Sequence, residues 1–213
     1  MKDLPVFATQ YGVASLVLRE IPPQGKAYVR LQAAQEPEKL LQECVSFCRM
    51  VGAQKVYATG HEILQQYPLH TAILKMRCLR SSLEDTDAAL WPVQEETLSR
   101  FREICNQKIL KIPNAAWMSE ADGKQMLADA EGYFVHRGGK LLGVGRVLGD
   151  EIRFLAATAP GSGADVVKAL ANAMTTEEVT VEVASANEKA MRLYERLGFI
   201  PVEEISRWYR IYE

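Results

Sequence analysis

Apolar and polar positions in the second half of the chain follow first a helical and then a strand-like spacing. Residues 93–110 place apolar side chains three and four apart behind two glutamates, which predicts an amphipathic helix. Ser119 stands three residues before Asp122 and predicts the start of a second helix. Residues 131–160 then alternate in three runs separated by glycine-containing pairs that suit tight turns. Two helices followed by a three-stranded meander are therefore expected.

A helix and strand alternation follows the meander. Residues 163–174 carry one apolar stripe, and residues 179–185 alternate valine with Thr, Glu and Ala. A further stripe runs from residue 187 to Gly198, which suits the left-handed stop of a helix. The aromatic-rich run at residues 207–211 predicts a last strand. This order indicates an α+β fold built on a mixed sheet.

The first half of the chain repeats part of this order. Two strands are predicted at residues 12–21 and 27–34, and a helix follows at residues 36–53. Two more strands are predicted at residues 55–60 and 70–78. Only the short segment 61–67 remains where the second half has its last helix. The polar stretch 80–87 is the expected boundary. We therefore predict two consecutive units of one kind, a truncated one over residues 1–82 and a fuller one over residues 88–213.

Composition and charge narrow the function classes. A net charge of −2 lacks the positive field of a nucleic-acid binder, so no nucleic-acid partner is expected. No apolar run is long enough to span a membrane, and the start of the chain lacks the order of a signal peptide. A cytoplasmic protein without a membrane partner is therefore expected. The four cysteines form no Cys-x-x-Cys pair and the three histidines are scattered, so no metal site is expected.

Residues 183–199, VASANEKAMRLYERLGF, resemble the signature of the GNAT superfamily of N-acyltransferases. In that signature a strand ends at an Asn, the next helix carries Ala and Tyr on its inner face, and Gly-Phe closes the helix. The element order from residue 92 onward is similar to that superfamily, and the first 80 residues resemble a truncated copy. The resemblance implies the GNAT acyl-CoA N-acyltransferase fold. It also implies acetyl-CoA as the acyl donor and an amine of a small molecule or peptide as the acceptor.

The same resemblance implies a donor site between two strands that splay apart, here residues 151–160 and 179–185. The pantetheine arm and the reaction's oxyanion would meet backbone groups of Leu155, Ala156 and Ala157. The diphosphate of the donor would lie at the start of the following helix, where N–H groups are unpaired. The residues at that turn are Gly161, Ser162, Gly163 and Ala164.

This phosphate loop departs from the family pattern. Thr158 stands where the family has Arg or Gln, and the loop is a few residues shorter than usual. Asp165 lies in the first helical turn, where its carboxylate would repel a diphosphate. The alternative interpretation is that Ser162 is only a helix N-cap backed by Asp165.

Four side chains outside the loop complete the implied site. Tyr194 is similar to the family's general acid, which protonates the departing thiolate, and Asn187 to a cofactor contact. If the two residues have only structural roles, Tyr194 is a core aromatic and Asn187 is a helix N-cap. Glu151, at a strand start, and Glu182, on the strand face opposite the valines, are alternative candidates for the base that deprotonates the amine. For both carboxylates, a solvated charge on a strand is the structural alternative.

The first unit is expected to bind no CoA, because its loop at residues 35–38 has no glycine and two acidic residues. Two alternatives to an enzyme follow from the whole sequence. A catalytically inactive GNAT-fold binding or regulatory module would explain the departing phosphate loop, whereas a pure interaction protein has no motif of its own. The last strand, residues 206–212, could pair with its copy in a homodimer if it lies at a sheet edge.

Overall fold

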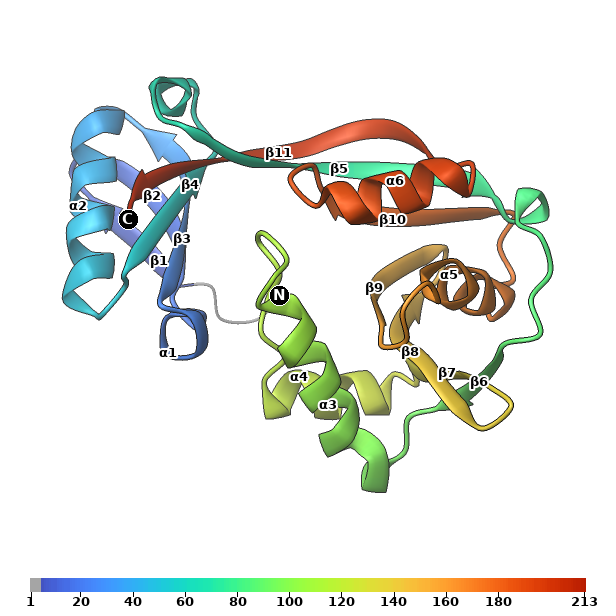
Figure 1. Cartoon of the computed structure of the whole chain (residues 1–213). Helices are drawn as coiled ribbons and strands as arrows, with labels where there is room; N and C mark the ends of the chain where they lie inside the picture. The colour runs from blue at the N-terminus through green and yellow to red at the C-terminus, as the bar shows by residue number, and fades with distance from the viewer. Residues whose placement is uncertain (1–4) are drawn as a thin grey trace. The chain divides into compact units, whose positions relative to one another are not determined.

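The computed structural model describes residues 5–213, so the first four residues of the predicted N-terminal unit lie outside it. The described chain forms two compact units (Figure 1). The first comprises the residues up to Ile73 together with Ile205–Glu213, and the second comprises Leu74–Glu204. This division differs from the predicted boundary at residues 80–87. The reason is that two strands, β5 (Leu69–Leu79) and β11 (Ile200–Tyr212), each begin in one unit and end in the other.

The first unit is a sheet with one long helix against it (Figure 1). Its strands follow the order β1-β2-β3-β4-β11, and the first four are β1 (Val6–Thr9), β2 (Gly12–Val17), β3 (Lys26–Ala34) and β4 (Lys55–Thr59). β2 pairs antiparallel with β3, β3 pairs parallel with β4, and β11 pairs antiparallel with β4. The short α1 (Ile21–Gln24) precedes β3, and α2 (Pro37–Met50) joins β3 to β4.

The helix α2 covers one face of this sheet with a single apolar stripe. Pro37 occupies its first turn, where a missing N–H costs nothing. Leu40, Leu41, Cys44 and Cys48 recur at helical spacing and are all buried in one cluster with side chains of β3 and β4. Burial raises the pKa of the Cys44 thiol to about 12. These cysteines are therefore packing residues, as their spacing indicated.

The segment 61–67, expected to be a shortened helix, forms the 3₁₀ turn η1 (Glu62–Gln66). The His61 side chain accepts a hydrogen bond from the Ile63 N–H at 3.3 Å, which caps this turn. β5 follows directly. The first unit thus lacks the helix that carries Asn and Tyr in the second unit.

The second unit contains the predicted meander. Its five complete strands follow the order β10-β9-β8-β7-β6, with bounds β6 (Ala89–Pro92), β7 (Gly132–Arg137), β8 (Lys140–Leu148), β9 (Glu151–Ala157) and β10 (Glu178–Ala184). β7, β8 and β9 pair antiparallel, as the glycine-containing turns predicted, and β10 pairs parallel with β9. β6, which the sequence did not reveal, pairs with β7.

Helices cover both faces of this second sheet. The helices are α3 (Glu95–Ile109), α4 (Glu120–Ala128), α5 (Gly163–Asn172) and α6 (Glu188–Arg196), and a 3₁₀ turn, η2 (Arg80–Ser82), follows β5. On one face, Phe101 and Met126 of α3 and α4 share a core with Ala156 of β9. On the other face, the valines of β10 share a core with α5 and α6. The valine alternation at residues 179–185 is therefore confirmed as a core-facing pattern.

Two glycines of β8 let α5 approach the sheet closely. A Cβ atom at Gly145 would lie 2.3 Å from Leu170 Cδ1 of α5. A Cβ atom at Gly143 would lie 2.6 Å from the Ala156 carbonyl oxygen and 2.7 Å from Val166 Cγ2. Any larger residue would push α5 or β9 out of place. These contacts fix the start of α5 relative to the end of β9, where the predicted site lies.

The last strand is not at a sheet edge. β11 lies between β4 and β5 in the strand order, and Tyr209 pairs with Ala58 of β4. The Arg210 N–H also donates to the Pro68 carbonyl at 2.9 Å, next to the start of β5. The condition for pairing with its own copy is therefore not met, because both of its edges are occupied, and the homodimer stays a prediction.

Candidate functional site

The site is organised by the separation of β9 and β10. These parallel strands pair at Glu151 with Thr180 and at Ile152 with Val181. On the other edge of β9, Ile152 lies opposite Val147 and Phe154 lies opposite Arg146, which leaves Arg153 as an extra residue in a β-bulge. A bulge bends and twists its strand. Within residues 5–213, the register of β9 with β10 extends no further than these two pairs.

Beyond the bulge, one edge of β9 is paired and the other is open. Leu155, Ala156 and Ala157 pair with β8 across the closed edge. In the described part of the chain, no strand pairs with these three residues on the side toward β10. An open strand edge can bind an extended chain that carries amide groups, because backbone N–H and C=O groups need partners. The predicted pantetheine contacts therefore lie on the open edge.

The turn after β9 is held by its own hydrogen bonds. Ser162 is 5% exposed, and its hydroxyl lies 2.7 Å from the Leu142 carbonyl oxygen and 2.8 Å from that of Ala159. The Ser162 side chain forms no cap hydrogen bond with α5. Ser162 is the N-cap residue of α5, as the alternative interpretation predicted, but its hydroxyl is directed to these carbonyls and does not cap the helix. The Thr158 hydroxyl is also engaged, since it donates to the Leu141 carbonyl at 3.2 Å.

Without a side-chain cap, the first turn of α5 keeps its N–H groups for another acceptor. A helix start has four N–H groups without an intrahelical partner, and they carry the positive end of the helix dipole. Gly161, with φ of 79°, turns the chain into this start, and Gly163 and Ala164 are its first helical residues. The geometry can accommodate an anion at this turn.

Asp165 lies in the same first turn, but its charge is compensated. Arg137, the last residue of β7, places Nη2 2.7 Å from Asp165 Oδ1. The Thr86 hydroxyl is 3.3 Å from the same oxygen. The expectation that Asp165 opposes an anion with its full negative charge needs correction, because a guanidinium contacts it directly.

Tyr194 is buried in the core between α6 and the sheet. It is 6% exposed, and its ring centroid lies 5.5 Å from that of Phe199. Burial raises the pKa of its phenol well above the usual value, so the group stays protonated at neutral pH. The residue is a core aromatic, and burial makes its phenol a weaker acid than that of an exposed tyrosine.

The two candidate carboxylates lie near the last residue pair before the strands separate. Glu151 pairs with Thr180, and Glu182 follows on the same face of β10. The pKa of Glu151 is raised, mainly because burial penalises its charged form. The positive charge of Arg153 partly offsets this rise. The negative charge of Glu182 adds to the rise. The structure therefore brings both candidates together rather than selecting one.

Asn187 is the N-cap of α6. Its side-chain oxygen accepts a hydrogen bond from the Ala190 N–H at 3.3 Å. The structural interpretation of this residue is thus confirmed. The cap fixes the start of the helix that carries Tyr194.

Two features of the second unit were missed in the sequence. The first is a buried clamp between α3 and the loop before α4: Asn106 Nδ2 donates to the Met118 carbonyl at 3.1 Å, and the Met118 N–H donates to Asn106 Oδ1 at 2.9 Å. Met118 shares a core cluster with Phe154 and Ala156 of β9. The clamp therefore holds this loop against the strand that opens. An asparagine inside a helical apolar pattern was its only signal.

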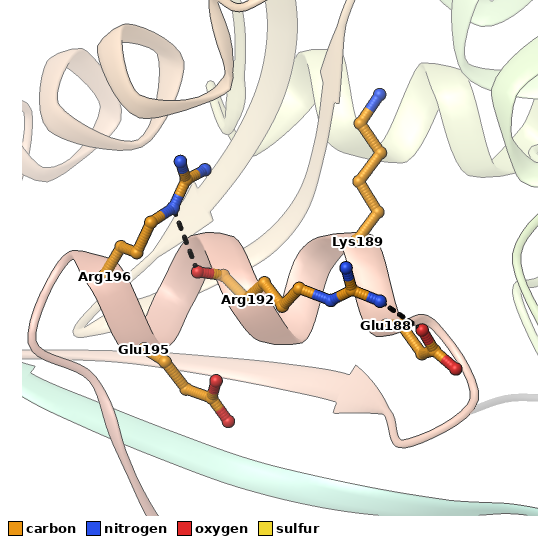
Figure 2. Close-up of a pocket in the computed structure, with 5 residues that line it drawn as sticks. All are labelled: Glu188, Lys189, Arg192, Glu195 and Arg196. Carbon is orange, nitrogen blue, oxygen red and sulfur yellow. Dashed lines mark hydrogen bonds and ion pairs between the residues drawn. The ribbon is translucent and has the colours of Figure 1, made fainter.

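The second feature is a hollow of about 860 Å³ beside the exposed face of α6, shown in Figure 2. Its lining side chains are all charged: Glu188, Lys189, Arg192, Glu195 and Arg196. Sequence reasoning treated α6 only through its inner stripe. The exposed face of an amphipathic helix gives no periodic signal of binding.

The corresponding turn in the first unit is closed. The N–H groups of Gln35 and Glu36 donate to the Tyr11 carbonyl oxygen at 2.9 and 3.2 Å. Pro37, at the start of α2, has no N–H to offer. This helix start has fewer free donors than that of α5.

Within residues 5–213, no helix is long and apolar enough to cross a membrane. The same part of the chain contains no cluster of three or more His, Cys, Asp or Glu side chains suited to a metal ion.

Comparison with known proteins gives one family match and many structural matches. Residues 157–209 match the family model of FR47-like proteins. This segment contains the end of β9, the turn that follows it, α5, β10 and α6. No curated protein matches the chain in sequence.

Among solved structures, the chain is similar to a functionally unknown conserved protein from Staphylococcus epidermidis, with a TM-score of 0.59 and 9% identity over 96% of this chain and 91% of that one. A putative acetyltransferase from Pyrococcus horikoshii gives a TM-score of 0.59 and 9% identity over 95% and 70%. An acetyltransferase of the GNAT family from Colwellia psychrerythraea gives a TM-score of 0.53 and 14% identity, over 97% of this chain and 84% of that one. At these identities the similarity shows a shared fold.

Proposed function

Because this chain has the fold of the GNAT acetyltransferases, we propose that it transfers an acetyl group from acetyl-CoA to the amine of a small molecule or peptide. The observation that carries the proposal is the early separation of β9 and β10, after the pairs at Glu151 and Ile152. This separation leaves a backbone edge open beside a helix start that has unpaired N–H groups. Both features suit a long ligand that has amides in its arm and phosphates at one end.

The donor would bind along this open edge. Its pantetheine amides would pair with backbone groups of Leu155, Ala156 and Ala157, and its diphosphate would accept N–H groups at the turn formed by Gly161, Ser162, Gly163 and Ala164. Asn187 would contribute through the helix start that it caps. The same β9 backbone N–H groups would stabilise the oxyanion that forms during attack.

The chemistry is a direct transfer. A base, Glu151 or Glu182, removes a proton from the acceptor ammonium, and the neutral amine attacks the thioester carbonyl carbon. A C–N bond forms as the C–S bond breaks, and the second amine proton leaves to the base or solvent. Tyr194 donates its proton to the departing thiolate and is reprotonated from solvent. The products are the N-acetylated acceptor and free CoA.

Calorimetric titration of the purified chain with acetyl-CoA and with CoA tests the donor site. We expect binding of both ligands, followed by release of free thiol when an amine acceptor is added. Absence of binding at millimolar ligand would rule out the enzyme. A panel of polyamines, amino acids and short peptides would identify the acceptor class.

A second candidate is a GNAT-fold module that binds a ligand without catalysis. It is favoured by the loop itself, because Thr158 replaces a basic or amide residue and its hydroxyl is already engaged. This candidate predicts CoA binding without thiol release for any amine. The first unit, over residues 1–82 in the sequence-based division, is proposed to have no donor site, because Tyr11 occupies two of its N–H groups.

A further inference from the structure

We propose that Lys189 and Arg196 of α6 bind the phosphate groups at the nucleotide end of the donor, and so replace the missing basic residue of the loop. The inference rests on the proposed function, since it concerns the same donor. Residues 158–163 contain no Lys or Arg. A ligand with several phosphate charges needs cations nearby, because charge-assisted hydrogen bonds are the stronger ones.

The first observation is the direction of the charged side chains around the hollow. Lys189, Arg192 and Arg196 follow the spacing of one helix face. In Figure 2, Lys189 and Arg196 extend to the same side of α6, whereas Glu195 extends to the opposite side. The hollow of about 860 Å³ that these residues line is large enough for a nucleotide.

The second observation is which cations are available. Arg192 forms an ion pair with Glu188, so its charge is compensated. Arg196 uses only Nε, which donates to the Arg192 carbonyl at 3.2 Å, and the rest of its guanidinium keeps its donors. In the part of the chain that the structure describes, neither Lys189 nor Arg196 forms an ion pair. Two uncompensated cations therefore border the hollow.

The third observation links these cations to the donor turn. Gly163, at the start of α5, packs against Leu193, because a Cβ atom at this glycine would lie 3.0 Å from Leu193 Cδ2. Leu193 is four residues after Lys189 and three before Arg196, and such positions are neighbours on a helix surface. The two cations therefore flank the point where α5 begins. A ligand phosphate at that turn lies between them.

The test compares two double variants by titration calorimetry. Lys189→Ala/Arg196→Ala removes the proposed cations, and the control Arg100→Ala/Lys124→Ala removes two exposed cations that are paired with Glu103 and Glu120 elsewhere in the unit. Each protein is titrated with CoA, with dephospho-CoA, which lacks the 3′-phosphate, and with pantetheine. Thermal unfolding confirms that all variants fold.

We expect the first variant to bind CoA at least about tenfold more weakly, which corresponds to about 1.4 kcal/mol, with pantetheine unchanged and the control like wild type. An equal loss for CoA and dephospho-CoA would assign the cations to the diphosphate, and a loss for CoA alone to the 3′-phosphate. Unchanged CoA affinity in the first variant overturns the inference and leaves the proposed function intact. Failure of the wild-type chain to bind CoA removes the proposed function as well.

Discussion

Arg137 Nη2 lies 2.7 Å from Asp165 Oδ1, which joins the end of β7 to the first turn of α5. Arg137 Nε also lies 2.5 Å from Asp87, and the Thr86 hydroxyl contacts the Asp165 carboxylate. One guanidinium thus ties three separate parts of the second unit together beside the proposed phosphate turn. The net charge at that turn depends on this pair more than on Asp165 alone.

The two members of this pair are expected to change donor affinity in opposite directions. Asp165→Ala removes a negative charge and frees Arg137, so acetyl-CoA should bind about threefold more tightly. Arg137→Ala leaves the carboxylate uncompensated and should weaken binding by a similar factor. Calorimetric titration at low salt measures both. Weaker binding by Asp165→Ala would show that the carboxylate helps the site instead, by stabilising the helix start.

Tyr194→Phe removes the proposed acid and little else. The phenol lies in a packed core, and the ring contact with Phe199 remains in the variant. We expect kcat to fall about 100-fold, a typical contribution of acid–base catalysis, with acetyl-CoA affinity nearly unchanged. Tyr133→Phe, in the same core, serves as the matched control. Equal kcat for wild type and Tyr194→Phe would exclude this residue from the mechanism.

The pH dependence of kcat/KM should identify the base. The pKa of Glu151 is raised above its usual value by burial and by the charge of Glu182, so its basic form is lost at a higher pH than for an ordinary glutamate. Activity should therefore decline on the acid side at a higher pH than an ordinary glutamate would give. Glu151→Gln should abolish this limb together with most of the rate. If Glu182→Gln does so instead, Glu182 is the base.

Asn106→Ala should destabilise the second unit. The buried Met118 N–H and C=O would lose both partners, and each unsatisfied group costs about 1–3 kcal/mol. Chemical denaturation should show a loss of about 2–4 kcal/mol in the free energy of unfolding. The control is Asn172→Ala, at an exposed helical asparagine. A loss of the same size in both variants would contradict a special role for the clamp.

Local periodicity was enough to predict most of this fold. The alternation at residues 179–185 and the stripe ending at Gly198 depend on neighbouring residues, and both appear in the structure as predicted. The mixed sheet, the meander and the shortened segment at residues 61–67 were predictable for the same reason. Asn187 is a cap in the structure because capping is also a local property.

Long-range relationships were not predictable in this way. Arg137 and Asp165 are far apart in sequence, and nothing in the vicinity of either residue indicates the other. The bulge at Arg153 depends on register with β8, which the composition of β9 does not encode. The Ser162 hydroxyl contacts the Leu142 carbonyl oxygen, which is distant in sequence, so this contact depends on the tertiary fold.

The path of β11 has a consequence for how the protein is made. The first unit is completed only by Ile205–Glu213, which are synthesised long after its other strands. Domains usually fold in order as they leave the ribosome. Here one edge of β4 has no partner strand until Ile205–Glu213 has been synthesised. The first unit can therefore reach its native state only after the whole of Leu74–Glu204 has been synthesised.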